Sequence, residues 1–305
     1  MNIANKDLNK AINKKIDTRN RIIAYAFLLP NFLGFLVFTL IPVLFSFVLC
    51  TMEWDTSNPI KFAGLGNFIT MFKDEGFYIS LLNTIYYTLT VVPGTLILSL
   101  ILALALSKGS KITNFFRSLF FFPYISSLVA VAVAWNMLFQ PDMGPINEIL
   151  RSLGISNPPG WTASTVWAMP AIIFVGIWKT MGYYMIIYIA GLNDIPVQLY
   201  EAATVDGANS WQKFWKVTVP MLTPTTFFVT IMLLINSFKV FDQIAVMTNG
   251  GPGRATNVLV YYIYNQAFVN FKMGYASAVA LVLFALVLTI TIVQFKNEEK
   301  WVNYM

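Results

Sequence analysis

Charge is what this sequence has least of. Only 11% of its 305 residues are Asp, Glu, Lys or Arg, and 57% are hydrophobic. Soluble domains carry about 25% charged residues. A soluble chain of this length would need a charged surface that these few residues cannot supply. Together with a mean hydropathy of +0.65, the composition predicts an integral membrane protein.

Histidine is absent, and Cys50 is the sole cysteine. Without imidazole, Ser-His-Asp triads and His-ligated zinc are excluded. One thiol forms neither an intrachain disulfide nor a cysteine-ligated zinc or iron–sulfur site. The sequence also lacks the G-x-x-x-x-G-K-[ST] motif of an ATP-binding P-loop. We therefore expect no catalytic residue, no metal site and no cofactor bound by this chain itself.

Six long, nearly uncharged stretches follow one another along the chain. Each exceeds the roughly 20 residues that cross a bilayer as a helix. They predict an all-α integral membrane protein with a transmembrane domain at residues 22–295. The fourth stretch is read across Lys179, because the residues after it are again uncharged. The six spans are predicted at about residues 22–49, 81–106, 118–139, 166–190, 217–242 and 273–295.

Basic residues are unequally divided among the segments that join these spans. The two termini and the loops after spans two and four hold 13 Lys and Arg residues. The remaining loops hold five, accompanied by six acidic residues. The positive-inside rule then places residues 1–21 and 296–305 in the cytoplasm. An even number of spans likewise places both termini on the same side of the membrane.

Two outer segments have helical patterns of their own. Ile146, Ile149 and Leu153 recur at helical spacing after Pro145, and the uncharged segment 255–271 is rich in Asn and Gln. A seventh span at 255–271 would break the agreement between charge and parity. We expect two short amphipathic helices at the outer membrane face.

The segment 191–220, between spans four and five, has the most specific pattern. Pro196 suits the first turn of a helix, with Asp194 as its candidate cap. Gly207 provides a left-handed stop, and a second helix is expected after Ser210. The alternative is an interfacial helix lying on the bilayer, because the aromatic and Lys residues here also suit that surface.

This segment resembles the EAA loop of permease subunits in bacterial ABC importers. The resemblance rests on Glu201-Ala202-Ala203-x-x-Asp206-Gly207-Ala208, then Phe214, Val219-Pro220 and Pro224. Motifs that resemble the carbohydrate-uptake branch, with its maltose, multiple-sugar and glycerol-phosphate permeases, are Phe62 to Phe68, Asn83-Thr84, Phe116-Arg117 with Pro123, Trp178-Lys179 and Thr248 to Pro252. The chain lacks the extra spans and the large periplasmic insert of the larger maltose-type subunit, so it resembles the compact multiple-sugar type.

The resemblance implies a type I ABC importer permease fold and import of a sugar or oligosaccharide across a bacterial cytoplasmic membrane. The chain would be a pore-forming subunit and not an enzyme. Its implied partners are a second homologous permease in a heterodimer, two copies of a cytoplasmic ABC ATPase that bind ATP and Mg²⁺, an extracytoplasmic sugar-binding protein and the lipid bilayer; nucleic acid is not among them. The implied ATPase contacts are Tyr200, Glu201, Ala202, Ala203, Asp206, Gly207 and Ala208.

Polar and aromatic residues within spans four and five are the candidate substrate pathway. Lys179 and Lys239 are costly in hydrocarbon and normally face a cavity or a partner. Aromatic faces, hydroxyls and amides suit a polyol, and in the family these regions build the cavity. Packing is the alternative for each aromatic residue, and an Asp242 ion pair is the alternative for Lys239. The candidates are Trp178, Lys179, Thr180, Tyr183, Tyr184, Asn236, Ser237, Lys239, Phe241 and Asp242.

A self-contained secondary transporter or channel for a small polar solute is the alternative function. Secondary transporters commonly show repeated, interrupted helices in both halves of the chain. The first half has no element like the segment 191–220, so the pattern favours the ABC importer. The sequence leaves open which sugar is carried, and also whether the substrate is a sugar or glycerol phosphate.

Overall fold

The computed structural model describes residue 20 and residues 22–302. The predicted N-terminal segment 1–21 lies outside the described residues, apart from Asn20. Within the described part of the chain, four helices are long and apolar enough to span a membrane. They are the first helix, Ile22–Leu49, then α4 (Glu75–Leu106), α8 (Ala168–Asn193) and α15 (Met273–Trp301).

Two further spans are bent helix pairs. Helix α5 (Lys111–Ile125) meets α6 (Leu128–Leu138) at 99°, and the helical stretch Ser210–Met221 meets α12 (Thr223–Phe238) at 62°. That stretch consists of α10 (Ser210–Lys213), a π-helical turn η3 (Phe214–Thr218) and α11 (Val219–Met221). The described residues thus contain up to six spans if each bent pair counts as one.

The bends change two of the predicted spans. The segment 118–139 is not one straight helix, because Ser126 and Ser127 are extended (ψ 145° and 127°). The segment 217–242 ends as a helix at Phe238, and Asp242 instead begins α13 (Asp242–Met247). The helix that contains predicted span two begins at Glu75, because Asp74 caps it by accepting a hydrogen bond from the Gly76 N–H.

Short elements occupy the segments between the spans. A hairpin of β1 (Met52–Glu53) and β2 (Lys61–Phe62) pairs Met52 with Phe62, and α3 (Gly66–Met71) follows it. The predicted helix after Pro145 is α7 (Pro145–Ser152). The predicted helix within 255–271 is α14 (Leu259–Tyr264), which continues as a π-helical turn η4 (Asn265–Val269). Both segments are helical as expected.

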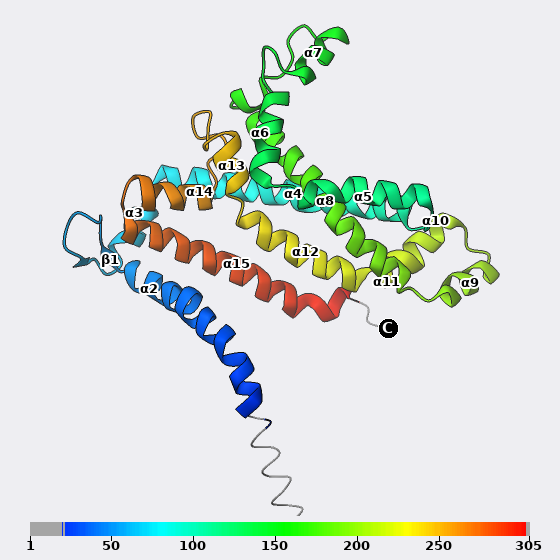
Figure 1. The fold of residues 1–305 in the computed structure, drawn as a ribbon, viewed down its shortest axis with the longest axis horizontal. Coiled ribbons are helices and arrows are strands. Elements are labelled where there is room, and N and C mark those ends of the chain that lie inside the picture. Colours follow the sequence, from blue (N-terminus) through cyan, green and yellow to red (C-terminus); the bar gives the residue numbers. More distant parts are fainter. Residues whose placement is uncertain (1–19, 21, 303–305) are drawn as a thin grey trace, which may run out of the picture.

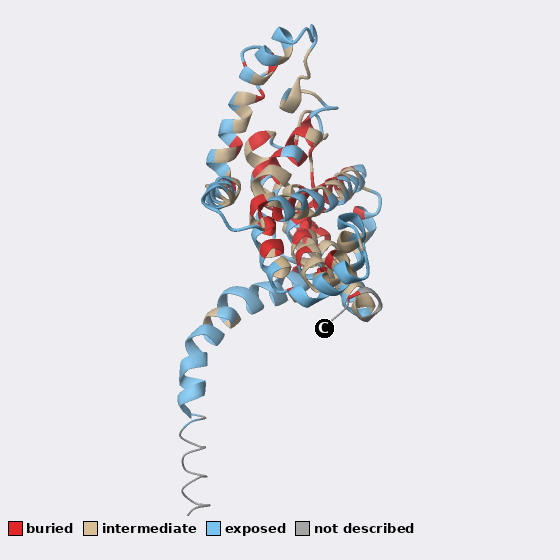
Figure 2. Cartoon of the chain, turned by 90° about the vertical axis from the view of Figure 1, so that its right-hand side faces the viewer, coloured by how far each residue is buried: buried red, intermediate tan, exposed pale blue. Residues whose placement is uncertain are grey.

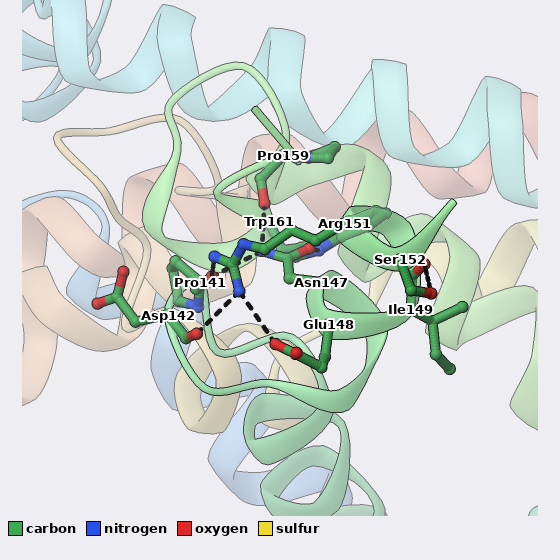
Figure 3. Close-up of polar contacts among 9 residues, drawn as sticks. All are labelled: Pro141, Asp142, Asn147, Glu148, Ile149, Arg151, Ser152, Pro159 and Trp161. Atoms are coloured by element: carbon green, nitrogen blue, oxygen red, sulfur yellow. Dashed lines mark hydrogen bonds and ion pairs between the residues drawn. The ribbon is translucent and has the colours of Figure 1, made fainter. Parts of the chain in front are cut away.

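Helices α6 and α7 form an arm that projects away from the bundle (Figure 1). Buried Asn147 holds the outer end of this arm together (Figure 3), because its Nδ2 donates to the carbonyls of Pro141 and Pro159 at 2.9 and 3.0 Å. The indole N–H of Trp161 (in η2, Trp161–Ala163) donates to Asn147 Oδ1 at 2.6 Å, and Arg151 donates to the Pro141 carbonyl at 2.9 Å. One amide therefore joins three turns of the arm.

The core lies around α8 and not around the first helix. Over its most apolar window α8 is 56% buried, whereas the first helix is 6% buried. Figure 2 shows the first helix almost wholly exposed as it diverges from the bundle. On α8, Ile172, Met185 and Tyr188 are fully buried. The first helix thus leaves its apolar surface to lipid or to another chain.

The segment between α8 and α12 forms a helix–glycine–helix unit. Helix α9 (Val197–Val205) ends before Gly207, whose φ of +78° is the left-handed conformation predicted for it. Asp194 is not the cap of α9, because it instead forms the C-cap of α8. Asn209 caps α10 by accepting from the Gln212 N–H. Helices α9 and α10 lie at one end of the bundle, and β1, α3 and α14 lie at the other (Figure 1).

Asp74 joins three helices at the end of the bundle opposite α9. Its carboxylate accepts from the Gly76 N–H at the start of α4 and from the hydroxyls of Tyr262 in α14 and Tyr275 in α15. Partial burial raises the pKa of Asp74, but hydrogen bonds from Tyr262, Tyr275 and Gly76 and the charge of Arg254 outweigh burial. The pKa of this carboxyl therefore lies below its usual range.

We expect Asp74→Asn to lower the unfolding temperature in detergent at pH 7. Each hydrogen bond to the charge contributes about 1 kcal/mol after solvent screening. Because the folded-state pKa is lowered, this stabilisation exists above the unfolded pKa and is lost as the pH falls through the folded one. Thermal unfolding followed from pH 7 to pH 3 should show the two proteins converging. Asp142→Asn is the control, because Asp142 is exposed and its carboxylate accepts no hydrogen bond from the described residues. Equal unfolding temperatures at pH 7 for Asp74→Asn and the parent would contradict the prediction.

Exposed positions allow the predicted orientation to be measured. In a Cys50→Ser background, single cysteines replace exposed Lys61, Lys111 or Asn209. An impermeant thiol reagent applied to right-side-out vesicles should modify only position 61, since the charge asymmetry places the other two inside. Position 61 reports that the reagent is active, and detergent permeabilisation should expose all three thiols. Modification at position 209 before permeabilisation would reverse the orientation.

Candidate functional site

A cavity of about 370 Å³ lies beside the break between α5 and α6. Its wall is formed by α4, the α5–α6 break, α8, α12 and the start of α13. Eight of the ten predicted pathway residues line it, which are Lys179, Thr180, Tyr184, Asn236, Ser237, Lys239, Phe241 and Asp242. The structure thus brings the residues before and after the segment 191–220 to one place.

Trp178 and Tyr183 are the two predicted pathway residues that do not line the cavity. The Trp178 ring contacts Trp135 of α6 edge-on, with ring centroids 5.3 Å apart. The Tyr183 ring stacks on Tyr124 of α5 at 4.3 Å and 13°. These two side chains therefore pack α8 against α5 and α6, which is the alternative that the sequence leaves open for its aromatic residues.

Lys179 faces the end of α5. Its Nζ donates to the carbonyl oxygens of Pro123, Tyr124 and Ser126 at 2.9, 3.4 and 2.8 Å. These acceptors lie 53 to 56 residues before Lys179 in the sequence. A search for a partner within one helical turn of Lys179 therefore does not find them. Lys179 is therefore both part of the cavity wall and a contact to a helix terminus.

Lys239 and Asp242 do not form the ion pair that their spacing suggests. An i, i+3 pair requires one continuous helix, but α12 ends before Lys239 and α13 begins at Asp242. Both side chains line the cavity, and no hydrogen bond or ion pair joins them in the described chain. The break between the two helices leaves both charges available to the cavity.

Hydroxyl and amide groups give the cavity its polar character. Thr180 and Ser237 donate to carbonyls of their own helices, Gly176 and Leu234, which leaves their oxygens free to accept. Exposed Asn236 donates to the Tyr184 hydroxyl over a long 3.5 Å. The site therefore presents acceptors and donors for a ligand that carries hydroxyl groups.

Tyr87 and Gln243 also line the cavity and are absent from the sequence-based candidates. Gln243 Nε2 donates to the Ile172 carbonyl at 2.6 Å, and the Tyr87 hydroxyl donates to Gln243 Oε1 at 3.5 Å. A Cβ at Gly176 would lie 2.7 Å from the Tyr87 hydroxyl oxygen, so only glycine allows this approach. Tyr87 lies in span two and Gln243 lies beyond the predicted span five, so no local pattern singles them out.

The helix–glycine–helix unit exposes most of its predicted contact residues. Glu201, Ala202, Asp206 and Gly207 are exposed, whereas Tyr200, Ala203 and Ala208 are partly buried. The Tyr200 hydroxyl hydrogen-bonds the Thr218 hydroxyl at 2.9 Å, which fixes α9 against η3. Helix α9 thus presents a polar and small-residue surface while its other side is held by the chain.

A family model for the inner membrane component of binding-protein-dependent transport systems matches residues 95–301. This match includes the helix–glycine–helix unit and every cavity-lining residue except Tyr87 and Val91. The chain belongs to this family. It is therefore a multi-pass inner membrane permease of a binding-protein-dependent system, and not a catalytic subunit.

Related permeases match the chain over nearly its whole length. It is 36% identical to the probable ABC transporter permease protein YurN of Bacillus subtilis (strain 168), over 91% of this chain and 96% of YurN. It is 35% identical to the lactose transport system permease protein LacF of Rhizobium radiobacter, over 89% and 92% of the two chains. It is 32% identical to the sn-glycerol-3-phosphate transport system permease protein UgpA of Agrobacterium fabrum (strain C58 / ATCC 33970), over 93% and 97%.

A solved structure confirms the predicted fold class. A chain of a bacterial ABC transporter involved in the import of the acidic polysaccharide alginate superposes with a TM-score of 0.83. The match covers 95% of this permease and 100% of that chain at 24% sequence identity. The permease thus has the type I ABC importer permease fold.

Asn236→Ala should raise the half-saturating substrate concentration of this permease by about fivefold, the equivalent of one hydrogen bond. The variant should still reach the membrane at the parental level, because Asn236 is exposed and loses only one long hydrogen bond. Uptake measured over a range of substrate concentrations checks this. The matched control is Asn114→Ala, which removes an exposed amide outside the cavity. A parental half-saturating concentration in Asn236→Ala would make Asn236 a packing residue.

Proposed function

We propose that this permease imports a sugar or oligosaccharide into the cytoplasm, driven by ATP hydrolysis on a separate subunit. One observation carries the proposal. The polar cavity lies between α8, which leads into the helix–glycine–helix unit, and α12, which leads out of it. A movement imposed on that unit would therefore act directly on the cavity.

The chemistry of the cavity supports a substrate rich in hydroxyl groups. Thr180, Ser237 and Asn236 offer hydroxyl and amide groups, and Phe241 and Tyr184 offer aromatic faces. The names of LacF and of the alginate importer refer to sugars, and that of UgpA refers to a polyol phosphate. We infer a carbohydrate substrate, with the cavity residues as its pathway and Trp178 and Tyr183 as their packing support.

Coupling to ATP is assigned to the residues predicted from the resemblance. Tyr200, Glu201, Ala202, Ala203, Asp206, Gly207 and Ala208 would enter a cleft of the ATPase. Small side chains allow close approach, and the exposed Glu201 and Asp206 offer charge to basic groups. Two ATPase copies would carry ATP and Mg²⁺, and this chain would bind neither.

The complete importer would contain a second, homologous permease in a heterodimer and an extracytoplasmic sugar-binding protein. The exposed apolar first helix supports a further membrane subunit, because 6% burial leaves its surface uncovered. The position of α9 and α10 at one end of the bundle, opposite β1, α3 and α14, supports separate sides for the ATPase and the binding protein. Both termini of this chain would be cytoplasmic.

Glu201→Lys and Gly207→Asp should each abolish uptake in vesicles that contain the whole importer. The first reverses a charge on α9, and the second places a side chain at φ +78°, which L-residues resist. Both variants should still reach the membrane. Gly154→Asp is the matched control, because Gly154 also has a positive φ of +90° and nothing near its Cβ position, but lies after α7.

Two results would contradict the proposal. Parental uptake in both coupling variants would remove the ATPase contact from α9. Uptake by the purified permease in vesicles without any ATPase would identify a self-contained transporter or channel instead.

A further inference from the structure

Helix α5 ends beside α8, and no glycine terminates it. It stops at Ile125, and Ser126 and Ser127 carry the chain into α6 at 99°. A helix end leaves its last carbonyls without intrahelical N–H partners. In the absence of water such carbonyls are costly, so the surrounding protein must supply donors.

Lys179 supplies these donors. The three carbonyl oxygens within 3.4 Å of its Nζ come from the last turn of α5 and the residue after it. An ammonium group has three N–H donors and no acceptor. Three acceptors therefore use its full hydrogen-bonding capacity, and its charge lies at the negative end of the α5 dipole.

Two neighbours on the same face of α8 extend this contact. At Gly182 a Cβ would overlap the carbonyl oxygen of Phe120, so the two backbones touch there. At Tyr183 the ring stacks on Tyr124. Lys179, Gly182 and Tyr183 have i, i+3, i+4 spacing, which places them on one helical face. This face of α8 holds the last turn of α5.

We propose that Lys179 is a positioning residue that joins α8 to the α5–α6 break, so that the two move as one body. Helix α8 leads through Asp194 to Pro196 into α9. The break supplies Tyr124 and Leu128 to the cavity wall. A displacement of α9 is thereby passed through α8 and Lys179 to the cavity. This role rests on the proposed function, in which α9 is the coupling helix, and differs from substrate binding by Lys179.

A distance measurement tests whether Lys179 holds α8 to the α5–α6 break, and it does not require transport. In a Cys50→Ser background, spin labels replace exposed Val133 on α6 and exposed Ile186 on α8 in the assembled importer. The parent should show a narrow distance distribution. Lys179→Met should broaden or shift it, and Lys179→Arg, which keeps charge and donors, should restore it. Lys239→Met is the matched control, because Lys239 lines the same cavity but donates no hydrogen bond to α5 among the described residues. This variant should retain the parental distribution.

Uptake by the same variants separates positioning from substrate contact. Lys179→Met should lower maximal uptake by about tenfold or more, as misplacement of a working site does. Its half-saturating substrate concentration should stay within about twofold of the parent, because the ammonium donors are already occupied by carbonyls. Lys179→Gln keeps two N–H donors without the charge, and gives an intermediate distance distribution if the Met variant does not assemble.

A parental distance distribution in Lys179→Met, or in Lys179→Gln where it replaces the Met variant, would overturn the proposal. If the half-saturating substrate concentration of that variant were also raised, Lys179 would be a substrate contact instead. Absence of ATP-driven uptake in the parent itself would refute the proposed function. The distance distributions would then still show whether Lys179 joins the two helices.

Discussion

The structure depends on one constraint, which is that a backbone carbonyl inside a membrane needs a donor from the protein. A continuous helix meets it by itself. The α5–α6 break does not, and a lysine from another span meets it instead. The bend therefore requires a polar contact between α5 and α8. The same bend forms one wall of the cavity.

Close backbone contact follows from the same arrangement. Gly182 lets α8 touch α5 at Phe120, and Gly176 leaves room for the Tyr87 hydroxyl. In lipid, where helices gain little from hydrophobic association, small residues at the interface allow the van der Waals contact that holds spans together. Helix α8, the most buried of the four single-helix spans, therefore carries glycines at its contacts with α4 and α5.

The two ends of the bundle differ in how their helices are held. At one end, the Asp74 carboxylate joins α4, α14 and α15 through hydrogen bonds. At the other, α9 is held on one side by Tyr200 and is otherwise exposed. One end joined by hydrogen bonds and an opposite end with an exposed, glycine-terminated unit suit the proposed importer, whose cavity would be moved from one side.

Hydropathy, charge and glycine geometry are local properties, so the sequence by itself determined the all-α membrane class, the positions of most spans and the turn at Gly207. It also located half of the residues that line the cavity, because Lys, Asn and Tyr stand out within apolar helices. Only the tertiary structure decided the bend at Ser126 and Ser127, the partners of Lys179 and the inclusion of Tyr87 and Gln243. These contacts join residues 53 to 156 positions apart, and the pairing of such distant positions depends on how the spans pack and not on any local pattern.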